Sequence, residues 1–201
     1  FYQDSTEYIE DALMPNEYAF QSRPGKVDNK RWAVKLDYEN AISDNVTLQA
    51  GYQGNFSREN SPQESFIDDT WDGLQQVEDK EYYNRFIYNM DLHALYATAT
   101  MKFGKLGVMA GLRGEYWKVN TESYNWEQEH DATKREPAFK KDYFELFPSL
   151  FMSYQLTETQ QLQLNYTRRL RRPWGGQLNS FKNTRDASII SYGNPELTPE
   201  F

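Results

Sequence analysis

The sequence predicts an all-β fold, an antiparallel up-and-down meander that forms part of a transmembrane β-barrel. Two observations favour this class. Apolar residues recur at every second position in several stretches, and the connections between those stretches alternate between short and long. No apolar run approaches the roughly 18 residues of a membrane-spanning helix. This criterion does not detect the strands of a β-barrel, because only every second residue of such a strand faces lipid.

The composition excludes several other classes of protein. The chain has 201 residues with 30 acidic and 22 basic side chains, a net charge of −8 and a pI near 4.9. This balance argues against nucleic-acid binding, which needs a basic face for the phosphates. There are no cysteines, and the two histidines, His93 and His130, are too few for a multi-histidine metal centre. Disulfides and thiolate zinc sites are therefore excluded.

The ends of the chain indicate a piece of a longer protein. Residues 1–5 lack the basic and apolar regions of a signal peptide, and residues 195–201 look like the beginning of another strand. We therefore expect a fragment or a mature region.

The first two strands are predicted at residues 32–38 and 46–57, with a short turn at 40–45. Apolar and aromatic residues occupy the even positions, and mainly polar residues lie between them. The even positions are Trp32, Val34, Leu36, Tyr38, Val46, Leu48, Ala50, Tyr52, Gly54 and Phe56.

The middle strands are predicted at 86–96 and 108–116, with a turn at 103–105. Their apolar even positions are Phe86, Tyr88, Met90, Leu92, Ala94, Tyr96, Val108, Ala110, Leu112 and Tyr116. His93 lies beside Asp91 on the polar face, so we expect this pair on the lumen side of a barrel. Gly104 provides the backbone freedom that a tight hairpin between 86–102 and 106–118 needs.

The last strands are predicted at 144–156 and 161–167, a hairpin closed at 157–159. The apolar even positions are Phe144, Leu146, Leu150, Met152, Tyr154, Leu156, Leu162, Leu164 and Tyr166. Pro148 cannot donate to a strand ladder and predicts a bulge at 147–149. Because side chains alternate strictly, we expect even residues of all six strands on one face and odd residues on the other.

The connections 58–82, 120–142 and 171–200 are long and polar. In a meander, alternate connections lie at the same end, so all long loops share one end and all short turns the other. This separation is typical of outer-membrane barrels. Aromatic residues near the long-loop ends suit a membrane interface, although the rim of a soluble core is the alternative. They are Tyr82, Tyr83, Phe86, Tyr116, Trp117, Tyr143, Phe144 and Phe147.

The C-terminal third carries the most specific motif. It reads Tyr192-Gly193-Asn194-Pro195-Glu196-Leu197-Thr198-Pro199-Glu200, after Leu164-Asn165-Tyr166-Thr167-Arg168-Arg169, Arg172-Pro173 and Gln177-Leu178-Asn179. With residues 103–107, 110–115 and 146–150, it resembles the barrel of TonB-dependent outer-membrane receptors. The strongest similarity is to the outer-membrane β-barrel family abundant in Bacteroidetes, over residues 31–201.

The resemblance implies a large barrel in the cell outer membrane, with about 22 strands around a plug. Such receptors import a scarce solute with energy relayed by a TonB-type coupler. Residues 1–201 would be a partial barrel domain of about six strands with external loops 58–82, 120–142 and 171–200. The implied partners are outer-membrane lipid, an unknown solute, and a plug and coupler that act through regions absent here.

Four arginines, Arg168, Arg169, Arg171 and Arg172, form a basic cluster. They could bind lipid phosphate or another anion, or pair with acids such as Asp186 and Glu196. We favour the ion pairs, because exposed pairs are common.

Asp68, Asp72 and Asp79 take the first, fifth and twelfth positions of a calcium loop. Thr70 occupies the third position and the last acid is Asp, so we favour a solvated acidic loop over a metal site.

The motif at 193–200 predicts a rigid turn, because Gly193 and Asn194 tolerate positive φ and Pro195 locks its own φ. Leu197 would then anchor the chain, with Pro199 and Glu200 completing the motif.

No nucleophile–base–acid set and no phosphate loop are recognisable, so neither an enzyme nor a cofactor is predicted. Three hypotheses follow: TonB-dependent uptake, a soluble all-β glycan-binding module with stacking Trp and Tyr residues, or a structural outer-membrane or surface protein.

Overall fold

The computed structural model describes residues 2–8, 17–68, 74–186 and 189–201. Its main element is a six-stranded antiparallel sheet with the strand order β10-β9-β8-β7-β4-β3. The strands are β3 (Asp28–Ser43), β4 (Val46–Gln63), β7 (Asn84–Phe103), β8 (Leu106–Tyr124), β9 (Phe139–Gln155) and β10 (Gln161–Thr167). This is the predicted up-and-down meander.

The short turns lie where the sequence predicts them. β7 and β8 pair from Phe103 and Leu106 onward, and Gly104 between them has a φ of 58°. That left-handed conformation favours glycine, which explains the residue in this turn. β9 and β10 also pair as predicted, with Gln155 opposite Gln161.

The strands extend well into the segments predicted as long loops. β4 continues to Gln63, and β8 continues to Tyr124. A smaller sheet follows the order β1-β2-β5-β6, formed by β1 (Tyr2–Tyr8), β2 (Glu17–Arg23), β5 (Phe66–Asp68) and β6 (Val77–Glu78). β1 and β2 lie before the first predicted strand, so the strand pattern begins earlier than expected.

Short helical elements complete the loop end of the molecule. η1 (Lys80–Tyr82) precedes β7, and α1 (Trp126–His130) and η2 (Ala132–Lys134) connect β8 to β9. After β10 the chain forms α2 (Gly175–Leu178) and the hairpin of β11 (Asn183–Asp186) and β12 (Ile189–Ser191). Among the described residues, no helix is long and apolar enough to cross a membrane.

The bulge predicted at Pro148 is not present. β8 and β9 pair without a register shift, with Leu112 opposite Pro148. On the other side the Pro148 carbonyl accepts from the Arg168 amide at 3.3 Å, just after β10 ends at Thr167. The N and C=O groups of one strand residue point to the same side, so the missing N–H faces the end of a neighbouring strand. The ladder therefore loses little there.

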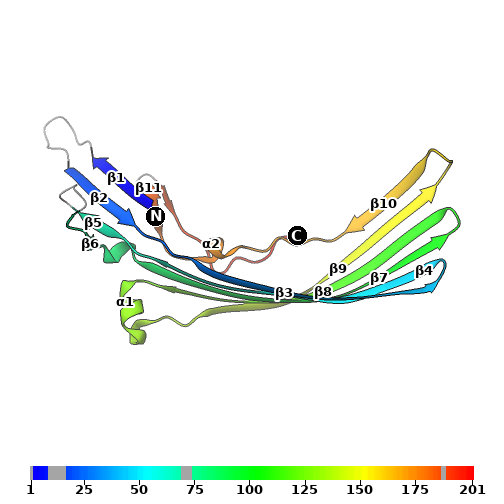
Figure 1. Ribbon diagram of the computed structural model, residues 1–201, viewed down its shortest axis with the longest axis horizontal. Coiled ribbons are helices and arrows are strands. Elements are labelled where there is room, and N and C mark those ends of the chain that lie inside the picture. The colour runs from blue at the N-terminus through cyan, green and yellow to red at the C-terminus, as the bar shows by residue number, and fades with distance from the viewer. Residues whose placement is uncertain (1, 9–16, 69–73, 187–188) are drawn as a thin grey trace.

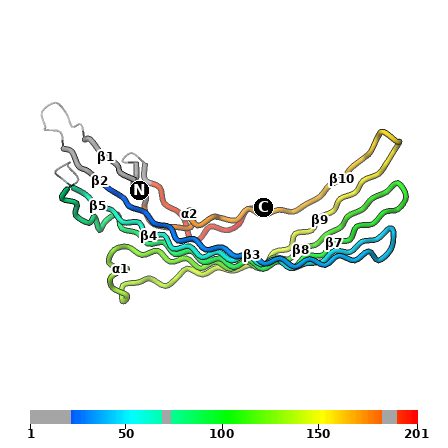
Figure 2. Tube along the Cα trace, in the orientation of Figure 1, coloured from blue at the N-terminus to red at the C-terminus, as the bar shows by residue number. Residues whose placement is uncertain are grey.

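The sheet is curved along its strands, and the chain after β10 returns over the concave side (Figure 1). α2 lies over the long-loop half of the sheet in both ribbon and tube views (Figures 1 and 2). The segment predicted as the external loop 171–200 therefore lies largely against the sheet. We call residues 168–201 the returning segment.

Candidate functional site on the inner face of the sheet

The strand register determines which side chains share a face, because directly opposed residues of an antiparallel pair point to the same side. One row across the sheet consists of Leu36, Tyr52, Leu95, Gly114 and Leu146. We call this side the outer face. Its exposed large apolar side chains are Trp32, Val34, Leu36, Tyr38, Leu48, Leu95, Leu112, Tyr116, Phe144, Leu146, Tyr154, Leu162, Leu164 and Tyr166. Such a continuous apolar surface is rare in soluble monomers and typical of a lipid-facing barrel wall.

The opposite side, the inner face, is polar over its short-turn half. Its polar residues include Lys35, Asp37, Gln49, Gln53, Tyr96, Thr98, Arg113, Glu115, Ser149, Ser153, Gln163 and Asn165. This matches the polar interior of a barrel.

The predicted faces are correct for β3, β4, β8, β9 and β10 and wrong for β7. Tyr52 of β4 is opposite Leu95, so the odd residues of β7 lie on the outer face. Met90 and Leu92 consequently lie on the inner face. The prediction failed because the outward-facing positions change from even numbers in β4 to odd numbers in β7, across the long connection between the two strands. The apolar even residues of β7 are buried by another part of the chain and do not face lipid.

His93 and Asp91 therefore lie on the outer face and not in the lumen. His93 Nδ1 is 2.8 Å from the Tyr52 hydroxyl, and its ring meets Phe56 edge-on at 5.4 Å. Asp91 pairs with Arg58 at 2.6 Å. Both polar groups thus have partners on the outer face.

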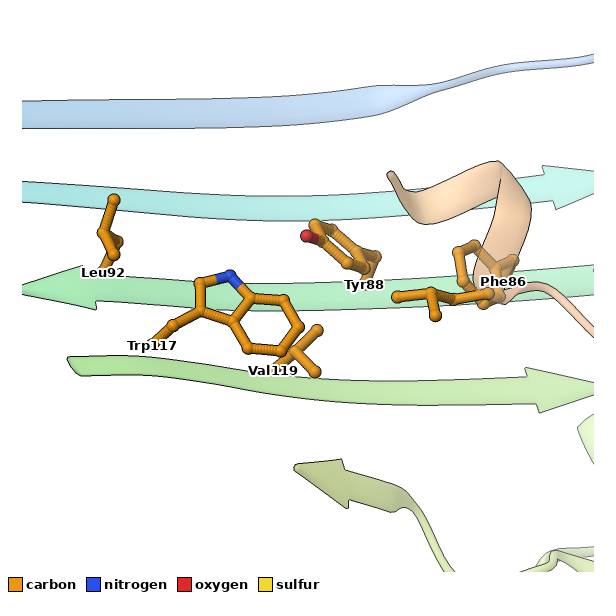
Figure 3. Packing of buried hydrophobic residues seen from close by; sticks show 6 residues of the cluster. Phe86, Tyr88, Leu92, Trp117 and Val119 are labelled. Atoms are coloured by element: carbon orange, nitrogen blue, oxygen red, sulfur yellow. The ribbon is translucent and has the colours of Figure 1, made fainter. Parts of the chain in front are cut away.

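An apolar cluster on the inner face holds α2 against the sheet. Phe86, Tyr88 and Leu92 of β7 and Trp117 and Val119 of β8 belong to one cluster on this face, and α2 lies over its Phe86 and Tyr88 end (Figure 3). Leu178 of α2 completes this cluster and is 3% exposed. Burying one such leucine contributes about 1.5–3 kcal/mol, enough to fix a short helix that could not persist alone.

Glu115 joins the returning segment to the sheet beside this cluster. Its carboxylate accepts from Arg113 of the same strand at 2.5 Å and from Arg172 of the returning segment. Arg113 also donates to the Gln53 side chain of β4 at 3.2 Å. One partly buried acid thus neutralises two cations from distant parts of the sequence.

The predicted arginine cluster does not act as a unit. Arg168 pairs with Glu145 at 3.1 Å and lies over the Phe201 ring at 4.0 Å, while Arg172 binds Glu115. The backbone of Arg171 bridges to Glu200. Arg169 is exposed.

Ion pairing of Arg168 and Arg172 agrees with the favoured expectation, but the acids come from β8 and β9. The partners expected from sequence were Asp186, whose side chain lies outside the described residues, and Glu196.

The motif at 193–200 forms a turn that is hydrogen-bonded to the C-terminal end of α2. The amides of Gly193 and Asn194 donate to the carbonyls of Asn179 and Gln177, each at 2.7 Å. Gly193 does not adopt positive φ, so that part of the prediction is wrong. A Cβ there would lie 2.4 Å from the Gln177 carbonyl oxygen, so glycine is needed for close approach.

The remainder of this motif fastens the returning segment to the sheet. The Asn194 side chain accepts from the Glu196 amide at 2.9 Å, and the Glu196 carbonyl accepts from Lys141 of β9 at 3.0 Å. Leu197 packs on the apolar cluster, the anchoring role that the sequence predicts for it.

The predicted calcium loop gains no support from the described residues. Asp68 is 1% exposed and accepts from the Gln75 amide at 2.7 Å, and Asp79 caps η1 through the Glu81 amide. Asp72 lies outside the described residues. In the part of the chain that the structure describes, no three acidic or histidine side chains are grouped as a metal site would require. The buried Asp68 also departs from the solvated loop that we favoured.

A groove of about 550 Å³ opens between the start of α2 and strands β3, β4 and β7. Trp174, 66% exposed, and Tyr88 border it with aromatic surface. Arg31 and Glu59 contribute opposite charges and both contact Asn29, at 3.2 Å. The groove thus combines flat apolar surface with charged hydrogen-bonding groups on the inner face.

Sequence reasoning missed the packing of the returning segment on the inner face. A signal was present, because Trp117 and Val119 are large apolar residues at odd positions of a strand whose even positions face outward. Apolar residues of both parities at the long-loop end indicate a strand covered on both sides.

Comparison with protein families matches residues 2–201 to the outer membrane protein beta-barrel family. Comparison with curated proteins found no match. Among solved structures, the ferric citrate transporter FecA in its unliganded form is similar, at 15% identity and a TM-score of 0.47. The similarity covers 81% of this chain and 22% of the transporter chain. The chain thus spans about a fifth of the length of that protein.

Proposed function

Because the chain belongs to the outer membrane protein beta-barrel family, we propose that it forms part of the wall of a receptor barrel for TonB-dependent uptake of a scarce solute. The chain lies in the cell outer membrane, with its outer face toward lipid. The resemblance of its C-terminal motif to TonB-dependent receptors supports the uptake role. A soluble glycan-binding module would not suit this location.

The observation that carries the proposal is the returning segment on the inner face. Leu178, Leu197 and the Arg172–Glu115 pair fix it there, in the space that the lumen of a barrel would occupy. Large barrels need such filling if they are not to remain open pores. We propose that the segment narrows the passage and that the groove beside Trp174 contacts the solute.

The sheet needs further strands to complete a barrel. β3 and β10 are its edge strands, and open edges are not tolerated in lipid. We propose that other strands of the same longer protein pair with them, around a plug. By the usual arrangement, the short turns face the periplasm and the long-loop end faces outward.

Conductance of the protein without its plug, measured in planar bilayers with KCl, tests the passage. Replacing residues 174–194 by a short Gly-Ser linker should raise the conductance severalfold, because it empties the inner face. The same replacement of residues 126–134, which carry α1 and η2, is the control and should change little. An unchanged low conductance for the first variant would indicate a structural outer-membrane protein.

Cross-linking in cells tests the energy coupling. The complete protein should form a cross-linked product with the TonB-type coupler, and a protonophore should alter its yield. Absence of any product would remove the TonB-dependence while leaving the barrel intact.

A further inference from the structure

The outer face carries a groove of about 450 Å³ that extends along β8 from Leu112 to Tyr116, at the border of the apolar surface. Its outward lining comes from four strands and is almost entirely apolar or aromatic, and it includes Tyr52, Leu95, Ala97, Leu112, Tyr116 and Phe144. Gly114 has no side chain to fill the bottom of the groove, where a Cβ would lie 3.1 Å from the Phe144 ring. This surface lies in the membrane, so its surroundings are lipid chains.

Two lysines lie directly beyond the groove on the same face. Lys118 follows Tyr116 by two residues, and Lys140 is opposite Asn120 on the neighbouring strand. Lys118 and Lys140 are thus diagonal neighbours, with Cβ atoms about 7–8 Å apart. Both side chains are exposed, and within the described residues neither ammonium group has an ion pair.

The acids nearby have other partners. Asp142, opposite Lys118, accepts from the Tyr116 hydroxyl at 3.3 Å. Glu122, farther from the apolar surface, accepts from Asn120 at 3.3 Å and from Tyr124. The two lysines therefore remain available for an external anion.

We propose that this groove and the two lysines bind a phosphorylated, acylated glycolipid of the outer leaflet. One acyl chain occupies the apolar groove, and a phosphate lies between Lys118 and Lys140. Ammonium groups bind phosphate strongly where the site is partly shielded from water. The proposal uses the outward orientation of the long-loop end given above but does not depend on uptake.

Native mass spectrometry of the complete protein in detergent tests this site, with bisphosphorylated lipid A as the probe. Lys118→Gln and Lys140→Gln should each lower the bound fraction about five-fold. Lys105→Gln, in the turn at the opposite end of the sheet, is the matched control and should bind like the wild type. Lipid A stripped of its phosphates should bind the wild type no better than it binds the Lys118→Gln variant.

A second pair of variants tests the groove independently of charge. Ala97→Phe, which fills the groove, should reduce lipid A binding, and Leu162→Phe, elsewhere on the outer face, should not. Three results would overturn the proposal: equal binding by the lysine variants and the Lys105→Gln control, undiminished binding by Ala97→Phe, or displacement of the lipid by excess inorganic phosphate. The conductance experiment above gives its result separately, so the two proposals can fail independently.

Discussion

Glu115 connects residues that lie far apart in the sequence, because its carboxylate serves Arg113 and Arg172 at once. Its side chain is 10% exposed, and the two arginines are 28% and 24% exposed. Removing an acid from such a site leaves two partly buried cations without a partner. Removing Arg172 leaves Glu115 paired with Arg113, so the two substitutions should have different costs.

We expect Glu115→Ala to lower the free energy of unfolding by about 3 kcal/mol and Arg172→Ala by about 1–2 kcal/mol. Urea unfolding of the complete protein in detergent micelles measures both. Lys35→Ala is the control, because the Lys35–Asp37 pair is exposed and should contribute at most about 1 kcal/mol. Equal losses for Glu115→Ala and Arg172→Ala would show that the acid is not shared.

At the scale of elements, the hairpins were predictable and the faces only in part. Gly104 and the polar residues at 157–159 identify tight turns from sequence alone, because turn chemistry is local. The face of β7 depends on the connection from β4, whose path through β5, β6 and η1 no local pattern determines. Alternation identifies which side of a strand is apolar, but it does not say whether lipid or protein covers that side.

The position of the returning segment could not be predicted from local sequence patterns either. Residues 171–200 are polar and rich in turn-forming residues, so they read as an external loop. Their placement depends on Leu178 meeting the cluster around Trp117, and on Arg172 meeting Glu115, 57 residues away. Such pairings are long-range and were not visible in the sequence. The Gly193-Asn194-Pro195 turn could be located from the sequence. The reason for its glycine could not, because Gly193 is required by the close approach of the Gln177 carbonyl and not by a positive φ.

The outward orientation of the odd-numbered residues of β7 can be tested directly with fluorescent labels. The chain contains no cysteine, so a single introduced cysteine would be the only labelling site in it. Ala97→Cys and Leu112→Cys, which are register partners, should both place a fluorescent label in lipid. Thr98→Cys, the next residue along β7, should place it on the inner face. Quenching by brominated lipids should therefore be strong for the first two labels and weak for the third. Strong quenching at Thr98 with weak quenching at Ala97 would restore the even-numbered face predicted from sequence.

At the scale of the whole molecule, the apolar part of the outer face has the height of a bilayer core. On β8 it extends from Leu106 to Tyr116 and is followed by Lys118. At about 3.4 Å per residue and a tilt near 45°, these residues rise roughly 26 Å. The apolar band of outer-membrane barrels is about 25 Å tall. The aromatic rings of Tyr116 and Phe144 lie at one border of this band, where amphipathic rings are favoured.

This geometry predicts a dependence on depth along β8 that a soluble protein would not show. Leu112 lies near the middle of the band and Tyr116 at its border, and both face outward. Arginine at position 112 should cost about 2–4 kcal/mol in a bilayer, falling to about 0–1 kcal/mol at position 116, where the side chain reaches water.

Refolding of Leu112→Arg and Tyr116→Arg variants of the complete protein into lipid vesicles measures this difference. Met109→Arg is the matched control, because Met109 lies on the inner face of the same strand and is 41% exposed. An arginine there can stay hydrated and should cost less than at Leu112. A penalty at Tyr116 equal to that at Leu112 would contradict the membrane position derived from the register, since burial in a protein core does not vary with distance from a bilayer midplane.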